Sequence, residues 1–143
     1  MANDLIPYKR PGEDVTGYAV AAITGKRCVQ IAAAKVNKAE GLSTTGEGGT
    51  YRVAHPSGAG ANGGAGKMIF GVAKYDQPTV AKLVGIIREG IVPITASAAI
   101  TAGQGVQVAA DGTVVPFTTG VQIGIVCDDC ANGADAEVAL LIS

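Results

Sequence analysis

Short apolar runs separated by Gly- and Asp-containing turns fill the last third of the chain, residues 93–143. Apolar positions that recur every second residue predict half-buried β-strands. The Asp111-Gly112 pair between two of these runs predicts a tight hairpin turn with positive φ values. Pro116 places the returning strand at a sheet edge or at a strand end. The expected strands cover residues 106–110, 113–117 and 137–142, with turns at 101–105 and 131–134.

The first part of the chain has a similar but less regular pattern. Apolar runs at 15–23 and 27–31 flank a Thr-Gly-Lys turn, which predicts two strands joined as a hairpin. Residues 32–40 are rich in Ala and Lys and fit one or two helical turns. Residues 68–73 read Met-Ile-Phe-Gly-Val-Ala, which is typical of a buried strand.

Residues 78–90 fit two kinds of element. Val80, Leu83, Val84 and Ile87 have the i, i+3, i+4, i+7 spacing of an amphipathic helix. The β-branched side chains and the Gly within the run are poor helix formers and favour a strand. An internal correspondence with the last residues of the chain also favours a strand.

This correspondence predicts two imperfectly repeated units, about 15–92 and 93–143. Residues 70–73 match 123–126, and in both places a polar turn follows and leads into an apolar run. Upstream, residues 19–29 with their Thr-Gly turn are matched to 106–115 with their Asp-Gly turn. The sequence therefore predicts a mainly β protein, with a small barrel-like or sandwich-like domain over residues 15–143.

Two segments fall outside this pattern. Pro7 and Pro11 hold residues 1–14 extended, as an arm that lies across a partner or as a frayed terminus. Nine of the 26 residues from Gly41 to Gly66 are Gly, which predicts a long surface loop. Tyr51-Arg52-Val53 within it is expected to be a short strand or a docking point.

Composition narrows the function. The chain has 143 residues, of which 48% are hydrophobic but only 4% aromatic, so Val, Ile, Ala and Leu must build the core. Charged residues make up 16%, against about 25% in typical domains, which predicts a surface covered by self-association or by a partner. The net charge of −1 without a basic stripe argues against nucleic-acid binding. No membrane span or signal peptide is expected, which indicates synthesis in a cytoplasm.

Candidate chemistry is sparse. Gly58–Gly63 matches the letters of a dinucleotide fingerprint, but no helix can begin there, and Gly66-Lys67 lacks the residues of a phosphate-binding loop. Cys127-Asp128-Asp129-Cys130 has the spacing of a zinc knuckle or a redox pair, but only one such pair exists. We interpret it as an acidic turn, with a disulfide or a metal site as the alternatives.

No catalytic site is expected either. Asp128, Asp129 and Asp135 fit a solvated turn better than a calcium loop. The chain has one His, so it offers no candidate catalytic triad. We expect no enzyme activity, no cofactor and no resident metal.

A family resemblance connects the β pattern to a function. The last 50 residues resemble the capsid decoration, or cement, proteins of tailed bacteriophages. The residues that carry the likeness are Ile-Thr-Ala-Gly-Gln-Gly-Val (100–106), Ala-Asp-Gly-Thr-Val (110–114), Gln-Ile-Gly-Ile-Val (122–126) and Ala-Asn-Gly-Ala-Asp-Ala-Glu-Val (131–138).

The resemblance implies a small β domain that binds the outside of an assembled capsid and bridges major capsid protein subunits. It implies a homotrimer, a place in the virion and synthesis in a bacterial host, and it carries over no catalytic residue. The alternatives are a carbohydrate- or surface-binding β-module and a small metal or redox protein built on Cys127 and Cys130. The residues expected to contact capsid or sister subunits are Leu5, Ile6, Tyr8, Lys9, Arg10, Tyr51 and Arg52.

Overall fold

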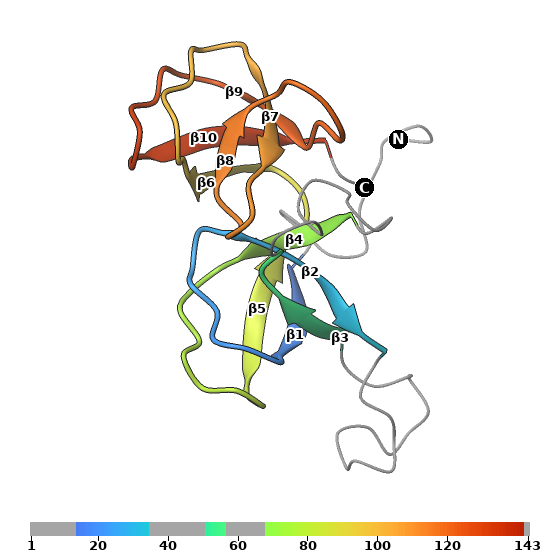
Figure 1. Ribbon diagram of the computed structural model, residues 1–143. Coiled ribbons are helices and arrows are strands. Elements are labelled where there is room, and N and C mark those ends of the chain that lie inside the picture. Colours follow the sequence, from blue (N-terminus) through green and yellow to red (C-terminus); the bar gives the residue numbers. More distant parts are fainter. Residues whose placement is uncertain (1–13, 35–50, 57–67, 142–143) are drawn as a thin grey trace, which may run out of the picture.

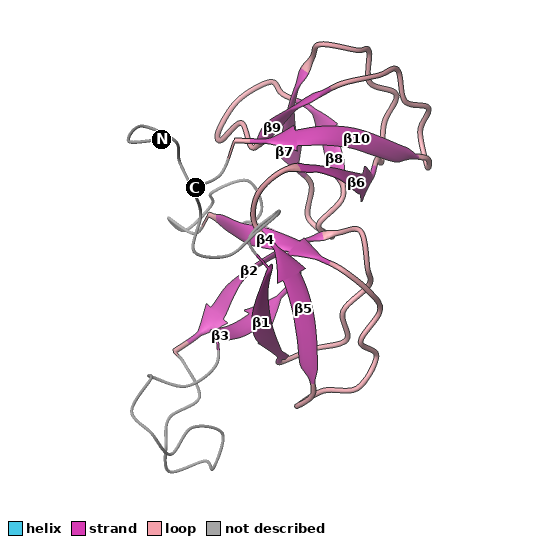
Figure 2. Ribbon diagram, turned by 180° about the vertical axis from the view of Figure 1, so that it is seen from behind, coloured by secondary structure: helices cyan, strands magenta, loops and turns pink. Residues whose placement is uncertain are grey.

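The computed structural model describes residues 14–34, 51–56 and 68–141, which form ten strands and no helix (Figure 1). Five strands close into a barrel, here called the barrel unit: β1 (Asp14–Ala19), β2 (Cys28–Ala33), β3 (Tyr51–Ala54), β4 (Ile69–Ala73) and β5 (Leu83–Ile87). The other five form a second sheet, the sheet unit: β6 (Ile91–Thr95), β7 (Gly105–Val108), β8 (Val114–Pro116), β9 (Gly124–Val126) and β10 (Asp135–Leu140). Viewed from behind, the sheet unit stacks on the barrel unit, with β4 at the boundary (Figure 2).

The two units have the same strand order. Around the barrel the order is β1-β5-β4-β2-β3, and in the sheet unit it is β6-β10-β9-β7-β8. The register agrees as well, since Val29 pairs with Gly71 and Val106 pairs with Gly124. Each of β6 to β10 is therefore the counterpart of the strand five places earlier. The fold is a tandem repeat of one five-stranded unit.

The predicted match of residues 70–73 with 123–126 agrees with this register, whereas the predicted match of 19–29 with 106–115 is wrong. Residues 14–33 align with 91–110 without a gap, at a spacing of 77 positions, and ten of the 20 pairs are identical. The Thr24 turn therefore corresponds to the Thr101 turn, and not to the Asp-Gly turn. The identical pairs are Val15/Val92, Ala19/Ala96, Ala21/Ala98, Ala22/Ala99, Ile23/Ile100, Thr24/Thr101, Val29/Val106, Gln30/Gln107, Ala32/Ala109 and Ala33/Ala110.

The units differ in how they close. In the barrel unit β1 pairs with β3 in parallel over three residue pairs, from Gly17 with Tyr51 to Ala19 with Val53. In the sheet unit β6 and β8 meet at a single parallel bridge, Ala96 with Val114. The rest of that gap is filled by the barrel unit, because Thr95 N–H donates to the Lys26 carbonyl over 2.9 Å and Cys28 N–H donates to the Gly112 carbonyl over 2.8 Å.

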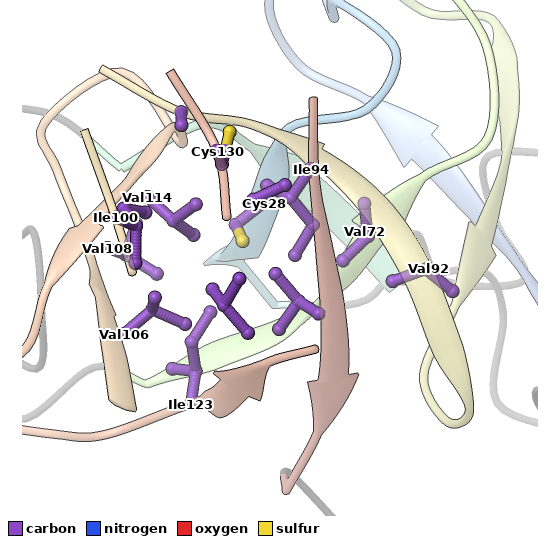
Figure 3. Packing of buried hydrophobic residues seen from close by; sticks show 14 of the residues in the cluster. Cys28, Val72, Val92, Ile94, Ile100, Val106, Val108, Val114, Ile123 and Cys130 are labelled. Carbon is purple, nitrogen blue, oxygen red and sulfur yellow. The ribbon is translucent and has the colours of Figure 1, made fainter. Parts of the chain in front are cut away.

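Buried side chains form two clusters. One fills the barrel with Ala, Val and Ile side chains. The other fills the sheet unit and includes Cys28, Ile69 and Val72 from the barrel unit. Figure 3 shows Cys28 between Ile94, Val114 and Cys130. The second cluster is thus shared by the two units and buries apolar area that neither would bury alone.

Most sequence-based expectations hold. The fold is all-β in the described residues and contains a small barrel, as predicted. Residues 83–87 form a strand, and residues 51–54 form β3. β7 and β8 pair as an antiparallel hairpin, and β8 lies at the sheet edge and ends at Pro116. No helix in the described part of the chain is long and apolar enough to cross a membrane.

Three further expectations are wrong. Residues 15–31 do not form a hairpin, because β3 lies between β1 and β2 and the intervening turn packs on residues 75–77 instead. Ala32 and Ala33, predicted to begin helical turns, extend β2. In the Asp-Gly turn only Gly112 has a positive φ, at 87°. Gly112 N–H donates to the Ala109 carbonyl over 3.1 Å, but Ala109 N–H donates to the Thr113 carbonyl over 2.8 Å, so the loop is one residue longer than a two-residue hairpin turn.

Candidate functional site

The segments predicted to contact a partner join the barrel at one rim. The pairing directions place the starts of β1, β3 and β4 and the ends of β2 and β5 at this rim. Residues 1–13 lead into β1, residues 35–50 connect β2 to β3, and residues 57–67 lead toward β4. All three segments lie outside the described residues. They include five predicted contact residues, Leu5, Ile6, Tyr8, Lys9 and Arg10, and most of the Gly-rich segment.

Partly buried apolar side chains mark this rim. Val15, Ile31, Tyr51 and Phe70 pack on the barrel core without being fully covered. The rings of Tyr51 and Phe70 lie 5.1 Å apart at 49°, a tilted arrangement favoured by aromatic pairs. A second layer of protein on this rim would bury additional apolar area, the main favourable contribution to protein association.

Arg88 adds a cation to the rim. Its Cζ lies 4.7 Å from the centre of the Phe70 ring, and its Nε donates to the Phe70 carbonyl over 2.9 Å. A guanidinium over an aromatic face is attracted by the ring's negative charge density. The rim is therefore apolar with a fixed positive group beside it.

The two predicted contact residues in the described region do not share a surface. Tyr51 belongs to the rim, whereas Arg52 lies on the outer wall, because successive side chains of a strand point to opposite faces. Arg52 Cζ lies 5.9 Å from the centre of the Tyr18 ring. Tyr18 pairs across the wall with Leu83, whose side chain is exposed.

A second candidate is an open groove at the junction of the units, with a volume of about 410 Å³. Lys26 Nζ and Asp135 Oδ2 lie 2.8 Å apart across it, and this hydrogen bond raises the pKa of Lys26. The remaining lining comes from both units: Gly25, Lys74, Tyr75, Asp76 and Thr95. The groove is polar and contains one aromatic side chain. The charges of Lys26 and Asp135 are already paired with each other.

His55 lies at the same junction with both ring nitrogens engaged. Thr24 N–H donates to Nε2 over 2.8 Å, so Nε2 is unprotonated and Nδ1 carries the proton toward the Cys28 carbonyl, also at 2.8 Å. Burial lowers the pKa of His55, and Arg27 lowers it further. Arg27 and Asp111 form an ion pair of 3.5 Å between the units. The neutral imidazole of His55 thus links the residues after β3 to the start of β2 within the barrel unit, beside the Arg27–Asp111 pair that joins the two units.

The three thiols are free. Cys127 is exposed, whereas Cys130 and Cys28 are buried, and burial raises the pKa of Cys28 to about 12 and raises that of Cys130. A raised pKa makes a thiol a poor nucleophile and a poor metal ligand at neutral pH. Among the described residues, no three His, Cys, Asp or Glu side chains are grouped as metal ligands.

The acidic turn between these cysteines holds a neighbouring turn by a hydrogen bond, and an equivalent bond exists in the barrel unit. Asp129 accepts a hydrogen bond from Ala102 N–H over 2.8 Å, and Asp76 accepts one from Gly25 N–H over the same distance. The barrel counterpart of the Cys127–Cys130 turn, residues 74–77, contains no Cys. The cysteines are therefore not needed to build this turn.

One further signal was missed in the sequence. Residues 1–90 contain all 11 Lys and Arg but only seven of the 12 Asp and Glu, for a formal charge of +4. Residues 91–143 contain the other five acids and no cation, for a charge of −5. The net charge of the whole chain conceals this separation, which a count for each unit would have revealed.

Comparison with known proteins supports the fold. No family model and no curated protein matches the chain. Among solved structures, a match is "The crystal structure of head fiber gp8.5 N base in bacteriophage phi29", with a TM-score of 0.63 and 16% sequence identity. The match covers 89% of this chain and 92% of the phi29 chain. At this identity the likeness shows a shared fold.

Proposed function

We propose that this chain is a structural protein of a tailed-phage virion that binds the outside of the assembled capsid. The observation that carries the proposal is the fold shared with the phi29 head fiber base over nearly the whole length of both chains. Fold alone does not determine function. The likeness of the last 50 residues to capsid decoration proteins is an independent reason for the same assignment.

The rim of the barrel is the capsid-binding surface in this proposal. The arm that begins the chain and the Gly-rich segments all join the barrel there, beside Tyr51, Phe70 and Arg88. An extended arm can add to an exposed sheet edge of a partner, where backbone hydrogen bonds supply affinity. The role needs no catalysis and no cofactor.

Stabilisation of the capsid then follows from mass action. A protein that binds the assembled lattice, and not its free subunits, shifts the equilibrium toward the assembled form. Bridging between neighbouring major capsid protein subunits requires either two contact surfaces in one chain or several chains in one assembly. We propose a homotrimer as that assembly, with the acidic sheet units and the basic barrel units in alternation.

Co-sedimentation with capsids tests the proposal. The probe is purified capsid from the phage that carries the gene, prepared without this protein. The full chain should pellet with capsids and raise the temperature at which they release DNA. A chain lacking residues 1–13 should stay in the supernatant, whereas an Asp128→Asn control, changed at an exposed turn away from the rim, should bind as the wild type does.

Two outcomes would overturn the proposal. The first is a wild-type chain that stays in the supernatant at every capsid concentration. The second is binding to host-cell polysaccharide but not to capsids, which would support a surface-binding module instead.

A further inference from the structure

An exposed apolar row crosses the outer face of the sheet unit. Ile91 on β6 pairs with Ala139 on β10, Ala139 pairs with Ile125 on β9, and Ile125 pairs with Gly105 on β7. Ile91 is 62% exposed and Ile125 is 38% exposed. Contiguous apolar side chains on an outer sheet face mark a surface that packs on another protein.

The repeat shows that the equivalent row in the barrel unit is a packing surface. Its barrel counterparts are Cys28, Val72 and Ile87, which correspond to Gly105, Ile125 and Ala139 by strand register. In the barrel unit this row is covered, because Cys28 and Val72 are buried in the shared core and Ile87 packs against it. Among the described residues, the row in the sheet unit is the same face without a neighbour.

The repeat also indicates where the matching face lies. Within the chain, Thr95 and Asp135 of the sheet unit contact Lys26 of the barrel unit. Their barrel counterparts are Tyr18 and Leu83, which pair with each other on the outer wall. Leu83 is 49% exposed, and Tyr18 is partly buried with Arg52 beside it.

We propose that the chain associates head to tail with a second copy of itself, the row Ile91–Ala139–Ile125–Gly105 packing on the Leu83–Tyr18–Arg52 wall of the next copy. The shapes of the two faces agree. Cys28 inserts between β6 and β8, whereas its counterpart Gly105 has no side chain to insert. The barrel wall correspondingly offers no gap, because β1 and β3 are paired.

Charge favours a second copy as the occupant. The sheet unit has a charge of −5, and its Glu137 lies on β10 two residues from Ala139, on the same face. The barrel wall contributes Arg52, with Lys82 directly before Leu83. Within the chain, cations of the barrel unit already pair with acids of the sheet unit, as Lys26–Asp135 and Arg27–Asp111. Complementary potentials of this kind set orientation in an interface.

This inference rests on the self-association included in the proposed function, and it names the two faces. Because the faces differ, the contact is heterologous, and repeated use of it closes a ring or extends a filament. Two variants each remove one face. Ile125→Glu places a charge in the row of the sheet unit, and Leu83→Glu places one on the barrel wall.

Sedimentation velocity over a concentration series tests the two faces with full-length chains. The wild type should sediment as an oligomer, and each variant alone should sediment as a monomer. A mixture of the two variants should form a dimer, because one intact row and one intact wall remain between them. Met68→Glu, at a site that is 56% exposed and on neither face, should keep the wild-type mass. Raising the salt from about 0.05 M to about 0.5 M should weaken the assembly at least tenfold.

Several outcomes would overturn the inference: a monomeric wild type, a variant that keeps the oligomer, or a variant mixture that stays monomeric. Far-ultraviolet circular dichroism establishes that each variant is folded, and Ile125→Ser and Leu83→Ser repeat the test without a new charge. Capsid co-sedimentation is measured separately. Variants that keep the oligomer but lose capsid binding would assign the row to the capsid, and would leave the proposed function intact.

Discussion

The barrel unit and the sheet unit have one topology but close in different ways, and one pair of equivalent positions illustrates the difference. A Cβ on Gly17 would lie 2.5 Å from Ile86 Cδ1 and 2.9 Å from Val53 Cγ2, so a larger side chain there would displace core side chains of β5 and β3. Its counterpart in the sheet unit is Ile94, which is fully buried. There the side chain occupies the core, and residues 26–28 of the barrel unit fill the space between β6 and β8.

This contrast shows how a duplicated unit comes to depend on its neighbour. A closed barrel satisfies its own edge strands. An open copy must have its edges and its core covered by something else. The barrel unit therefore supplies both backbone partners and apolar volume to the sheet unit. Mutations at the junction should accordingly harm the sheet unit more than the barrel unit.

The largest expected effect comes from Ile94, which fills the core of the open unit. Ile94→Ala should lower the free energy of unfolding by about 2–5 kcal/mol, because it removes buried methyl groups and leaves a cavity. Met68→Ala is a control at an exposed side chain outside both proposed faces, and should change stability by less than about 0.5 kcal/mol. Urea denaturation of both variants measures the difference. Equal losses would contradict the placement of Ile94 in the core.

Gly112 should be next in effect, because it meets two constraints at once. Its φ is 87°, and a Cβ there would lie 2.5 Å from the Cys28 carbonyl oxygen, a backbone atom. Gly133 has nearly the same φ, 86°, but a Cβ there would meet no atom of the described residues within 4 Å. Gly133→Ala should therefore cost only the conformational penalty, about 1–2 kcal/mol.

Gly112→Ala should cost about 1–2 kcal/mol more than Gly133→Ala, because the contact between the units must also open. Thermal unfolding of both variants provides the comparison. If the two variants melt together, the Asp-Gly turn is not packed against the barrel unit.

The sequence predicted where the strands lie better than which strands pair with each other. Alternating apolar positions identified residues 106–108 and 114–116, and the Gly-containing run identified 69–73. Pairing is not local, so the insertion of β3 between β1 and β2 could not be derived from the turn at Thr24. The repeat at a spacing of 77 was the missing information, since it matches that turn to the one at Thr101.

The candidate surfaces were less predictable than the fold. Tyr51 and Arg52 were selected as a pair because they interrupt a Gly-rich segment. Alternation along β3 separates them onto the rim and the outer wall, and only the register of β3 determines which goes where. Exposure of Ile125 was also hidden in the sequence, because its counterpart Val72 has the same chemistry and is buried.

Cys28 provides a smaller test of the shared core. Cys28→Ser should destabilise the protein by about 1–3 kcal/mol, because a hydroxyl replaces the thiol in an apolar cluster. Cys127→Ser, at an exposed thiol, should change the free energy of unfolding by less than about 0.5 kcal/mol. Chemical denaturation under reducing conditions measures both. A larger loss at Cys127 would instead support the metal or redox alternative for the Cys127–Cys130 turn.

The smallest expected effect is a pH dependence from His55, which bonds Thr24 and Cys28 at the same time only as the neutral imidazole. Its pKa in the folded chain is lowered from 6.5, mainly by burial. The unfolded state then binds the proton more readily, so the stability from this group is complete above pH 6.5 and is lost as the pH falls from 6.5 toward the lowered value. Asp111, whose pKa is lowered from 3.8 mainly by its hydrogen bond with Thr113, acts at lower pH.

Urea denaturation between about pH 7.5 and about pH 5 should therefore show a small decline in the free energy of unfolding, below about 1 kcal/mol, because solvent screens this partly exposed group. His55 is the one His of the chain, so His55→Gln removes this titration and should make the profile flatter over the same range. The Gln side chain cannot reproduce both hydrogen bonds of the imidazole ring, so the variant should also have a lower free energy of unfolding at pH 7.5. An unchanged slope in the variant would show that the decline comes from the carboxylates and not from His55.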